Sequence, residues 1–457
     1  MILRVINHPY EFDMKNLCIT FFPHEKIRLE GEEDPVVVTT RRETDGSFFV
    51  SAKVYDVYRE TTAKPEPADE EHLVLSVTLY RLLSGILGFA PPWGVLYGVR
   101  PAKLMHRLCA QMGDDAAVAH FQTAFLTQKS KAELAHEVML HENRSIARSG
   151  PKSFSLYVSI PFCPTRCAYC SFVSHSIEKT HKLMTPYVDL LLRELEETSK
   201  YAKELGLELA TVYFGGGTPT TLSAQDLGRI FSTIEQNFDL SHLMEYTVEA
   251  GRPDTVTRER LEVIRAAGVQ RISINPQSFN DKVLEAIGRR HTAQQTLDAF
   301  ALARDCGFDH INMDFIAGLP EDDLPSFQRS IQTALDLQAE SITVHTLALK
   351  TSAYMVTREQ TFDLKDRLTV SNMVDYAGQT LHGAGYYPYY MYRQSKSLGN
   401  LENVGWCKPG YDCLYNVYMM DETHTVLAVG AGAVTKLRGQ NSGMIERIYN
   451  YKYPYEY

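Results

Sequence analysis

The chain has 457 residues, of which 44% are hydrophobic and 22% charged, and its formal net charge is −10 at pH 7. This length allows one large core and at least one smaller core, and the composition is that of a globular protein. The negative charge argues against a nucleic-acid partner, because a broad nucleic-acid footprint needs clustered basic residues.

The sequence also indicates the cellular compartment of the protein. The first residues, Met1 to Arg4, show no basic region followed by an apolar run, so we expect no signal peptide. The most apolar stretch, residues 73–99, is interrupted by Arg81 and by Pro91-Pro92, which argues against a membrane span. Three of the eight cysteines fall within eight positions, an odd group that fits a metal better than a disulfide framework. We therefore predict a cytoplasmic protein.

Residues 1–150 predict an N-terminal α+β accessory domain. Short β-type runs cover residues 17–22, 35–40 and 48–55, and Asp45-Gly46 between the last two is a hairpin signal. A linker is expected over residues 61–69 and helices over 73–87 and 101–112, the second with proline in its first turn. The run WGVLYGVR at 93–100 is interpreted as packing, and no reaction motif is found here.

From Ser155 onward, short apolar runs alternate with longer amphipathic ones, which predicts βα units. The expected strands are 156–160, 210–214, 245–250, 271–275, 310–316 and 341–347. Helices are expected between them, for example over 187–205 and 224–237. Six units predict an α/β fold with a partial (β/α)6 TIM-like barrel over residues 151–390, followed by a C-terminal extension, 391–457, that packs on it. The chemistry of such barrels lies at the C-terminal ends of the strands.

The first barrel strand runs into a loop with the pattern C-x3-C-x2-C, formed by Cys163, Cys167 and Cys170. A structural zinc site needs four ligands, and no second pair with zinc-knuckle spacing stands nearby, since Cys407 and Cys413 lie too far apart. Three thiolates on one loop suit three irons of a [4Fe–4S] cluster and leave the fourth iron open to a chelating ligand. The alternative is three unrelated buried thiols.

The second strand ends in FGGGTPT, residues 214–220. Glycines allow a ligand to approach the backbone closely, and bare carbonyls at a strand end can accept hydrogen bonds from an ammonium group. A phosphate-binding loop of the Walker type would need a lysine that is absent. One strand after a cysteine loop, this run indicates a site for S-adenosyl-L-methionine (SAM).

Taken together, these motifs resemble the radical SAM family of oxygen-independent coproporphyrinogen III dehydrogenases, also called oxidases. The resemblance covers residues 156–436 and is closest to the HemZ-like branch. The segments that carry it are YVSIPFCPTRCAYC, YFGGGTPT, TVEAGRP, RISINPQSFN, IGRRHT, MDFIAGLP and AVGAGAVTKL, together with YRQSKSLGNLENVGWCKPG at 392–410.

The resemblance implies a role for each matching residue. Cys163, Cys167 and Cys170 would ligate the [4Fe–4S] cluster, and Tyr157 and Tyr169 would lie beside SAM as the catalytic pair. The implied SAM contacts are Gly216, Gly217, Thr218, Glu249, Gln277, Arg289, Asp314, Ala348 and Val434. His345 matches no role and is interpreted as a core residue.

The implied activity is oxidative decarboxylation of coproporphyrinogen III propionates to vinyl groups in anaerobic haem biosynthesis. It follows reductive cleavage of SAM to methionine and a 5′-deoxyadenosyl radical. The expected partners are a small-molecule tetrapyrrole substrate and an electron donor of the flavodoxin or ferredoxin type. Because the substrate carries four carboxylates, cationic contacts are expected, and the candidates are Arg166, Lys350, Arg393 and Lys396.

The sequence departs from the family in ways that leave two other functions open. Phe172 stands where other members carry a fourth cysteine, and the chain reaches Tyr457 in an aromatic run that either packs back or is cut short. One alternative is a haem chaperone, whose relatives carry His-Asn-x-x-Tyr-Trp. Here only Asn403 to Trp406 (NVGW) is found, without the histidine. The other is a radical SAM methyltransferase that opens haem anaerobically.

Overall fold

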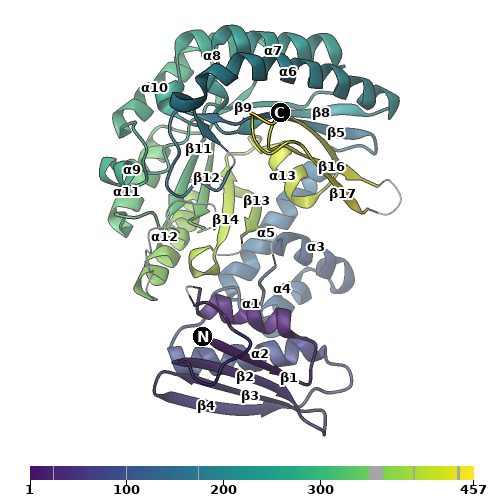
Figure 1. The fold of residues 1–457 in the computed structure, drawn as a ribbon, viewed down its shortest axis with the longest axis vertical. Helices are drawn as coiled ribbons and strands as arrows, with labels where there is room; N and C mark the ends of the chain where they lie inside the picture. The colour runs from purple at the N-terminus through teal and green to yellow at the C-terminus, as the bar shows by residue number, and fades with distance from the viewer. Residues whose placement is uncertain (24, 99, 173, 349–363, 395–396, 440–442) are drawn as a thin grey trace. The chain divides into compact units, whose positions relative to one another are not determined.

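The computed structural model describes the chain except for residues 24, 99, 173, 349–363, 395–396 and 440–442 (Figure 1). The chain divides into two compact units. The first comprises residues 1–139, 360–371 and 392–402, and the second comprises residues 140–359, 372–391 and 403–457. The division at 150 and 390 expected from the sequence stays a prediction.

The first unit contains a four-stranded sheet in the order β1-β2-β3-β4. Its strands are β1 (Ile2–Ile6), β2 (Val36–Arg42), β3 (Phe48–Val54) and β4 (Val57–Ala63). β1 is parallel to β2, and β2, β3 and β4 pair antiparallel. The predicted turn at Asp45-Gly46 joins β2 to β3, with Gly46 at φ 83°, in the left-handed region that favours glycine. This confirms the hairpin.

Helices bury the apolar face of this sheet. α1 (Glu11–Phe21) and α2 (Glu71–Leu87) contribute Met14, Leu17, Leu75 and Leu79 to one core with the strands. The β-type reading of residues 17–22 is therefore wrong. The buried residues of α1 include Met14, Leu17, Cys18 and Phe21, whose spacing is helical and not alternating.

The remaining helices of the N-terminal part follow α2. The helix expected over residues 101–112 is confirmed as α3 (Pro101–Met112), with the proline at its first position. It is followed by α4 (Asp114–Thr123) and α5 (Lys129–Ile146). The predicted linker over 61–69 starts too early, because residues 61–63 belong to β4.

The second unit is built on six parallel strands, as the βα pattern predicts. They are β5 (Ser153–Ile160), β8 (Glu208–Gly216), β9 (Glu245–Glu249), β10 (Arg271–Ser273), β11 (His310–Ala317) and β12 (Ser341–Thr346). Each strand is parallel to the next. Their interior residues, such as Val158, Phe214 and Ile272, are fully buried, as expected for strands covered on both faces.

Further strands extend this sheet to the order β13-β14-β12-β11-β10-β9-β8-β5-β15-β16-β17. They are β13 (Tyr387–Arg393), β14 (Glu402–Cys407), β15 (Thr425–Val429), β16 (Val434–Arg438) and β17 (Ile445–Tyr449). β14 is antiparallel to β12, and β15 is parallel to β5. Among the described residues the two edges do not pair, so the sheet is a partial barrel, as predicted.

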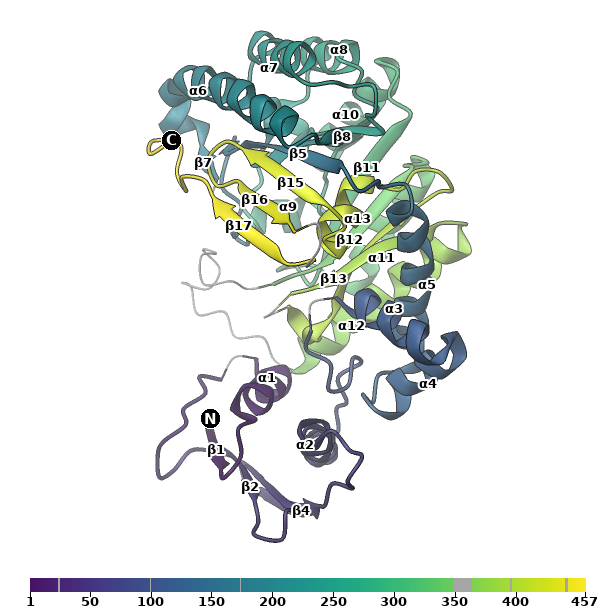
Figure 2. The same cartoon turned by 90° about the vertical axis from the view of Figure 1, so that its right-hand side faces the viewer.

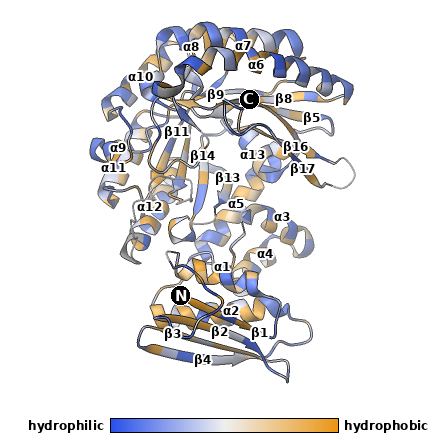
Figure 3. Cartoon of the chain, viewed as in Figure 1, coloured by the Kyte–Doolittle hydropathy of each residue, from blue (hydrophilic) through white to orange (hydrophobic). Residues whose placement is uncertain are grey.

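Helices connect and cover the parallel strands. They are α6 (Ile177–Glu204), α7 (Ala224–Asn237), α8 (Arg258–Ala266), α9 (Asp281–Ala286), α10 (Ala293–Asp305), α11 (Leu324–Asp336), α12 (Leu364–Gly383) and α13 (Leu414–Asp421). Figures 1 and 2 show α6, α7 and α8 side by side along one face of the strands. Figure 3 shows hydrophilic colour on these helices and hydrophobic colour on the strands. In α7, Leu227, Ile230, Phe231 and Ile234 are buried, so the apolar face of this helix packs inward.

Two smaller features complete this unit. Two short strands, β6 (Phe162–Cys163) and β7 (His175–Ser176), pair parallel around the cysteine loop. The terminal aromatic run packs back, since the ring of Tyr457 lies 4.9 Å from that of Tyr187 in α6. None of the helices in the described part of the chain is long and apolar enough to cross a membrane.

Candidate functional site

The three motif cysteines lie on one loop after the C-terminal end of β5. Cys163 ends β6, Cys167 is 8% exposed, and Cys170 is partly exposed. The loop is fixed at several points, because the Ala168 amide donates to the Ile287 carbonyl at 2.9 Å and the Cys170 amide donates to the Cys167 carbonyl at 3.1 Å. All three thiols are free in the structure. Backbone hydrogen bonds thus fix the loop that carries all three predicted ligands.

The glycine run at the end of β8 is bound to the start of this loop. The Gly217 amide donates to the Ile160 carbonyl at 2.8 Å, and the Thr218 amide donates to the Phe162 carbonyl at 2.7 Å. The Thr218 hydroxyl lies 3.4 Å from the Cys163 sulfur. A Cβ at position 217 would lie 2.6 Å from the Phe162 carbonyl oxygen, so only glycine fits this close approach. The two motifs form one structural element.

In the absence of a metal, burial favours the protonated form of two of these thiols, Cys163 and Cys170. Burial raises the pKa of Cys163 to about 11, and burial together with the charge of Cys167 raises the pKa of Cys170. A bound metal deprotonates thiols that coordinate it, and the energy of binding offsets this cost. Three such thiols on one loop are a donor set that fits three irons of a [4Fe–4S] cluster.

A carboxylate ends the neighbouring strand β9. The Glu249 carboxylate accepts a 2.6 Å hydrogen bond from the Tyr213 hydroxyl. Burial raises the pKa of Glu249 to about 7, although the Tyr213 hydrogen bond lowers it. A carboxyl group with this pKa is poised to ionise when a cation binds beside it.

A second carboxylate lies in β11, next to β10 in the sheet. Asp314 accepts a 2.7 Å hydrogen bond from the Asn312 side chain, and its other oxygen lies 3.8 Å from Nε2 of His345. Burial acts to raise the pKa of Asp314, but the hydrogen bond and charge of His345 outweigh it and the pKa is lowered. His345, interpreted above as a core residue, is therefore the partner of a predicted site residue.

Gln277 and Arg289 follow β10. Gln277 has a left-handed backbone, with φ 68°, and its amide donates to the Asp314 carbonyl at 2.9 Å. Arg289 donates to the Asn275 carbonyl at 2.6 Å and approaches the Tyr169 hydroxyl at 3.5 Å. The guanidinium thus connects the cysteine loop to the end of β10.

Several buried polar atoms of this region have no hydrogen-bond partner among the described residues. They are Oδ1 of Asn275, Oε1 of Gln277 and Nε of Arg289. Buried polar atoms are normally paired, and each exception needs an explanation. Here the unpaired atoms belong to residues that follow β10 in the chain, of which Arg289 approaches Tyr169 of the cysteine loop and Gln277 binds the Asp314 carbonyl through its amide. They fit a polar ligand such as the amino-acid part of SAM.

The remaining predicted site residues are Tyr157, Ala348 and Val434. Tyr157 lies within β5 and stacks on Tyr213 and Tyr415, with ring centroids 6.2 and 5.9 Å apart. Ala348 follows β12 and is half-buried, and Val434 begins β16 near the opposite edge of the sheet from β12. Their predicted roles beside SAM stay predictions.

The expected cationic substrate contacts need one correction. Arg393 is 2% exposed, donates to the Leu96 and Asn400 carbonyls, and lies over the Trp93 ring. It is a packing residue of the first unit, as is the fully buried Trp93, which agrees with the packing interpretation at the start of that run. Lys350 and Lys396 lie outside the described residues. Arg166 lies on the cysteine loop.

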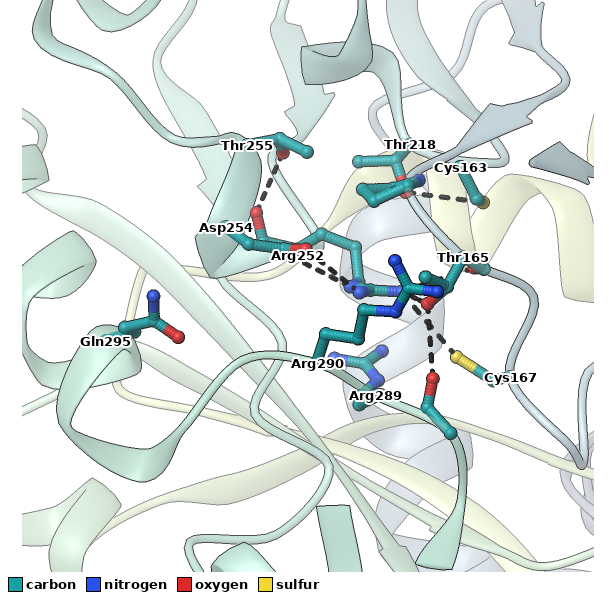
Figure 4. A network of polar contacts seen from close by, with 12 residues as sticks. Cys163, Thr165, Cys167, Thr218, Arg252, Asp254, Thr255, Arg289, Arg290 and Gln295 are labelled. Atoms are coloured by element: carbon teal, nitrogen blue, oxygen red, sulfur yellow. Dashed lines mark hydrogen bonds and ion pairs between the residues drawn. The ribbon is translucent and has the colours of Figure 1, made fainter. Parts of the chain in front are cut away.

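Sequence reasoning missed two residues that the fold brings to this site. Tyr213 lies two residues before the glycine run and donates a hydrogen bond to Glu249. Arg252 follows β9 and is 3% exposed, and its Nη1 lies 4.0 Å from the Cys167 sulfur. Figure 4 shows Arg252 reaching toward Thr165 and Cys167. Both residues sit inside the segments YFGGGTPT and TVEAGRP, and the available signal for Arg252 was an arginine three residues after Glu249, which ends β9.

Comparison with known proteins agrees with this geometry. The family model described as the radical SAM superfamily matches residues 157–334. The oxygen-independent coproporphyrinogen-III oxidase-like protein HemZ of Bacillus subtilis is 34% identical over 97% of this chain and 92% of its own length. The chain belongs to the radical SAM superfamily, in the HemZ-like branch of the coproporphyrinogen oxidase family. As a member, it uses a [4Fe–4S] cluster and SAM as cofactors.

Two further relatives of this HemZ-like protein bear on its function. The haem chaperone HemW of Bacillus subtilis is 31% identical over 64% of this chain and 74% of its own length. The coproporphyrinogen III oxidase HemN of Escherichia coli, described as a radical SAM enzyme, shares the fold with a TM-score of 0.53. It is 22% identical, and the match covers 70% of this chain and 71% of HemN.

Proposed function

We propose that this HemZ-like protein catalyses the oxidative decarboxylation of coproporphyrinogen III propionates to vinyl groups, which forms protoporphyrinogen IX. The similarity to HemZ over 97% of the chain supports this substrate class. When bound, the cluster and SAM together supply a reductively generated radical that removes a hydrogen atom from the substrate. The protein's own residues bind and orient these groups and exclude water.

The chemistry of each strand-end residue suits it to a different part of the cluster or of SAM. Cys163, Cys167 and Cys170 would hold the cluster. Arg289, whose Nε has no partner in the described part of the chain, would bind the SAM carboxylate, because guanidinium groups match carboxylate geometry. Glu249 and Asp314 would accept hydrogen bonds from the ammonium or ribose hydroxyl groups.

The predicted backbone and apolar contacts come from neighbouring strands. Gly216, Gly217 and Thr218 would bind the methionine part of SAM and Gln277 would hydrogen-bond to it. Tyr157 and Tyr169 would lie beside SAM. Ala348 and Val434 would line the adenine. All of these assignments follow from the family resemblance.

One observation favours the decarboxylase over the chaperone. The residue before Asn403 is Glu402, not histidine, and it is 1% exposed. Its carboxylate is 2.7 Å from Nζ of Lys131 and accepts a 2.7 Å hydrogen bond from the Trp93 indole. Asn403 is also buried and accepts a hydrogen bond from the Thr346 amide. A carboxylate engaged in a buried ion pair cannot serve as a haem ligand in the way a histidine does.

We further propose that the enzyme works in the cytoplasm with an electron donor of the flavodoxin or ferredoxin type. All eight cysteines are free, which fits a reducing compartment. A low-potential cluster needs such a donor to be reduced before SAM cleavage. Arg166 is the described cationic candidate for a substrate propionate.

Anaerobic turnover tests the proposal. Reconstituted protein is incubated with coproporphyrinogen III deuterated at the propionate β-carbon, SAM and a reductant, and the products are read by mass spectrometry. We expect one methionine, one 5′-deoxyadenosine carrying deuterium and one carbon dioxide per vinyl group, because radical transfer needs near-contact geometry.

The alternatives give different products. Stoichiometric haem binding with no deuterium in the 5′-deoxyadenosine would favour the chaperone. Methylated tetrapyrrole from haem would favour the ring-opening methyltransferase. Either result overturns the decarboxylase while leaving the radical SAM fold intact.

A further inference from the structure

Arg252 is a buried cation beside the cysteine loop. It follows β9 and precedes a short 3₁₀ turn, Pro253–Thr255, and it is 3% exposed. Its Nη1 donates to the Thr165 carbonyl at 3.3 Å and to the Thr165 hydroxyl at 3.1 Å, and lies 4.0 Å from the Cys167 sulfur. A guanidinium is always charged in a protein, so this positive charge is fixed.

The rest of the guanidinium is held on its other side. Nε and Nη2 each donate to one oxygen of Asp254 at 3.0 Å, in a bidentate pair. The Arg252 carbonyl accepts hydrogen bonds from the amide and hydroxyl of Thr255 at 2.9 and 2.8 Å. Figure 4 shows Asp254 and the cysteine loop on different sides of Arg252. The carboxylate therefore orients the arginine and leaves Nη1 pointing at the loop.

The two charges do not cancel at Cys167. Arg252 is 3% exposed, whereas the Asp254 side chain is 22% exposed, so water screens the carboxylate more than the guanidinium. The carboxylate also binds the edge of the guanidinium that faces away from Cys167. The loop thus experiences a net positive field from this pair.

We infer that Arg252 is a positioning residue for the cluster that also raises its reduction potential. Three thiolates and a [4Fe–4S]²⁺ core carry a net negative charge, and reduction adds one more. A fixed cation beside one ligand stabilises the reduced form more than the oxidised form, and the net charge and hydrogen bonding around a cluster set its potential. The inference concerns the cluster and does not depend on which tetrapyrrole is the substrate.

The test measures the cluster potential of anaerobically reconstituted protein by a redox titration followed by electron paramagnetic resonance. Arg252→Gln should shift the reduction equilibrium toward the oxidised cluster by about tenfold, which is about 59 mV for a one-electron couple. Arg252→Lys keeps the positive charge but loses the planar guanidinium, so its shift in potential should be smaller than that of Arg252→Gln. Asp254→Asn should shift the potential in the opposite direction, because it removes the opposing negative charge.

A matched control separates charge from general damage. Arg260 of α8 is also partly buried and donates to the carbonyls of Leu222 and Thr255 without contacting the cysteine loop. Arg260→Gln should leave the potential unchanged. If Arg252→Gln loses its iron, Asp254→Asn still decides the question, since its cluster should load.

Two outcomes would overturn the inference. One is an unchanged potential in both Arg252→Gln and Asp254→Asn, which would make the arginine a purely structural tie. The other is a potential that rises in Arg252→Gln, which would mean that the guanidinium does not stabilise the reduced cluster.

Discussion

Buried charges occur in both units, but their surroundings differ. In the first unit, Lys131 and Glu402 form an ion pair at 2.7 Å, with side chains 5% and 1% exposed, and Trp93 donates to the same carboxylate. In the second unit, burial raises the pKa of Glu249 to about 7, and Nε of Arg289 is unpaired as far as the structure describes the chain.

This difference separates buried charges that stabilise the fold from buried charges that can bind a ligand. A charge whose partners are supplied by the fold belongs to the fold, because removing a partner would leave the other buried alone. A charge that the fold leaves incompletely paired carries a free-energy cost that a ligand can remove. By this criterion the Lys131–Glu402 pair of the first unit is structural, and we propose the strand ends of the second unit as the binding site.

The largest effect is expected at the cysteine loop, which carries the proposed cluster ligands. Anaerobically reconstituted protein should hold about four irons per chain, and Cys163→Ala, Cys167→Ala or Cys170→Ala should abolish this, since a three-thiolate site cannot lose a ligand and keep its cluster. Iron and sulfide analysis measures the effect. Cys18→Ala, Cys109→Ala and Cys306→Ala are matched controls and should keep full iron content. Finding Cys407 or Cys413 equally necessary would show that the ligands are misassigned.

The structural reading of the first unit predicts the next largest effect. Lys131→Met leaves Glu402 buried without its cation and should destabilise the unit by about 3–5 kcal/mol. The double variant Lys131→Met/Glu402→Leu should recover most of that loss, because both charges are gone. Hydrogen exchange of the amides of residues 129–139 measures the local stability. Iron content should stay normal in both variants, and a loss of iron in either would mean that this ion pair serves the cofactor site.

Much of the second unit could be predicted from the sequence. Six parallel strands appear as near-continuous apolar runs, such as β8 and β11, and motifs at their ends mark the site. α1 was missed because a single-chain pattern cannot show which face will be covered, and its sheet supplies that cover. Arg252 and His345 were missed because their partners, Cys167 and Asp314, lie 85 and 31 positions away in the chain. Only the fold brings such pairs together.

The ligand-binding reading of the strand ends predicts a smaller effect on SAM affinity. Glu249→Gln and Asp314→Ala should each weaken SAM binding by about 10- to 150-fold, the usual worth of a hydrogen bond to a charged group. Iron content should not change, because neither residue is a cluster ligand. Anaerobic calorimetry measures the affinity, and Glu235→Gln on the exposed face of α7 serves as the control. Normal affinity in both variants would remove these carboxylates from the site.

The smallest effect is a pH dependence that belongs to Glu249. Burial raises the pKa of this carboxyl group from its ordinary value to about 7, so in the free protein it is largely protonated below that pH. A cationic group of SAM binds the ionised form, and binding below the pKa must therefore release a proton. Affinity should rise as pH increases, by about tenfold between pH 6 and 8, and then level off.

Calorimetry in buffers of different ionisation enthalpy would count the released proton. Glu249→Gln should bind SAM more weakly and without this slope. Asp314→Asn should keep a slope but move it to lower pH, because the charge of Asp314 contributes to the raised pKa of Glu249. A slope that survives in Glu249→Gln would assign the titration to another group and leave Glu249 as a structural partner of Tyr213.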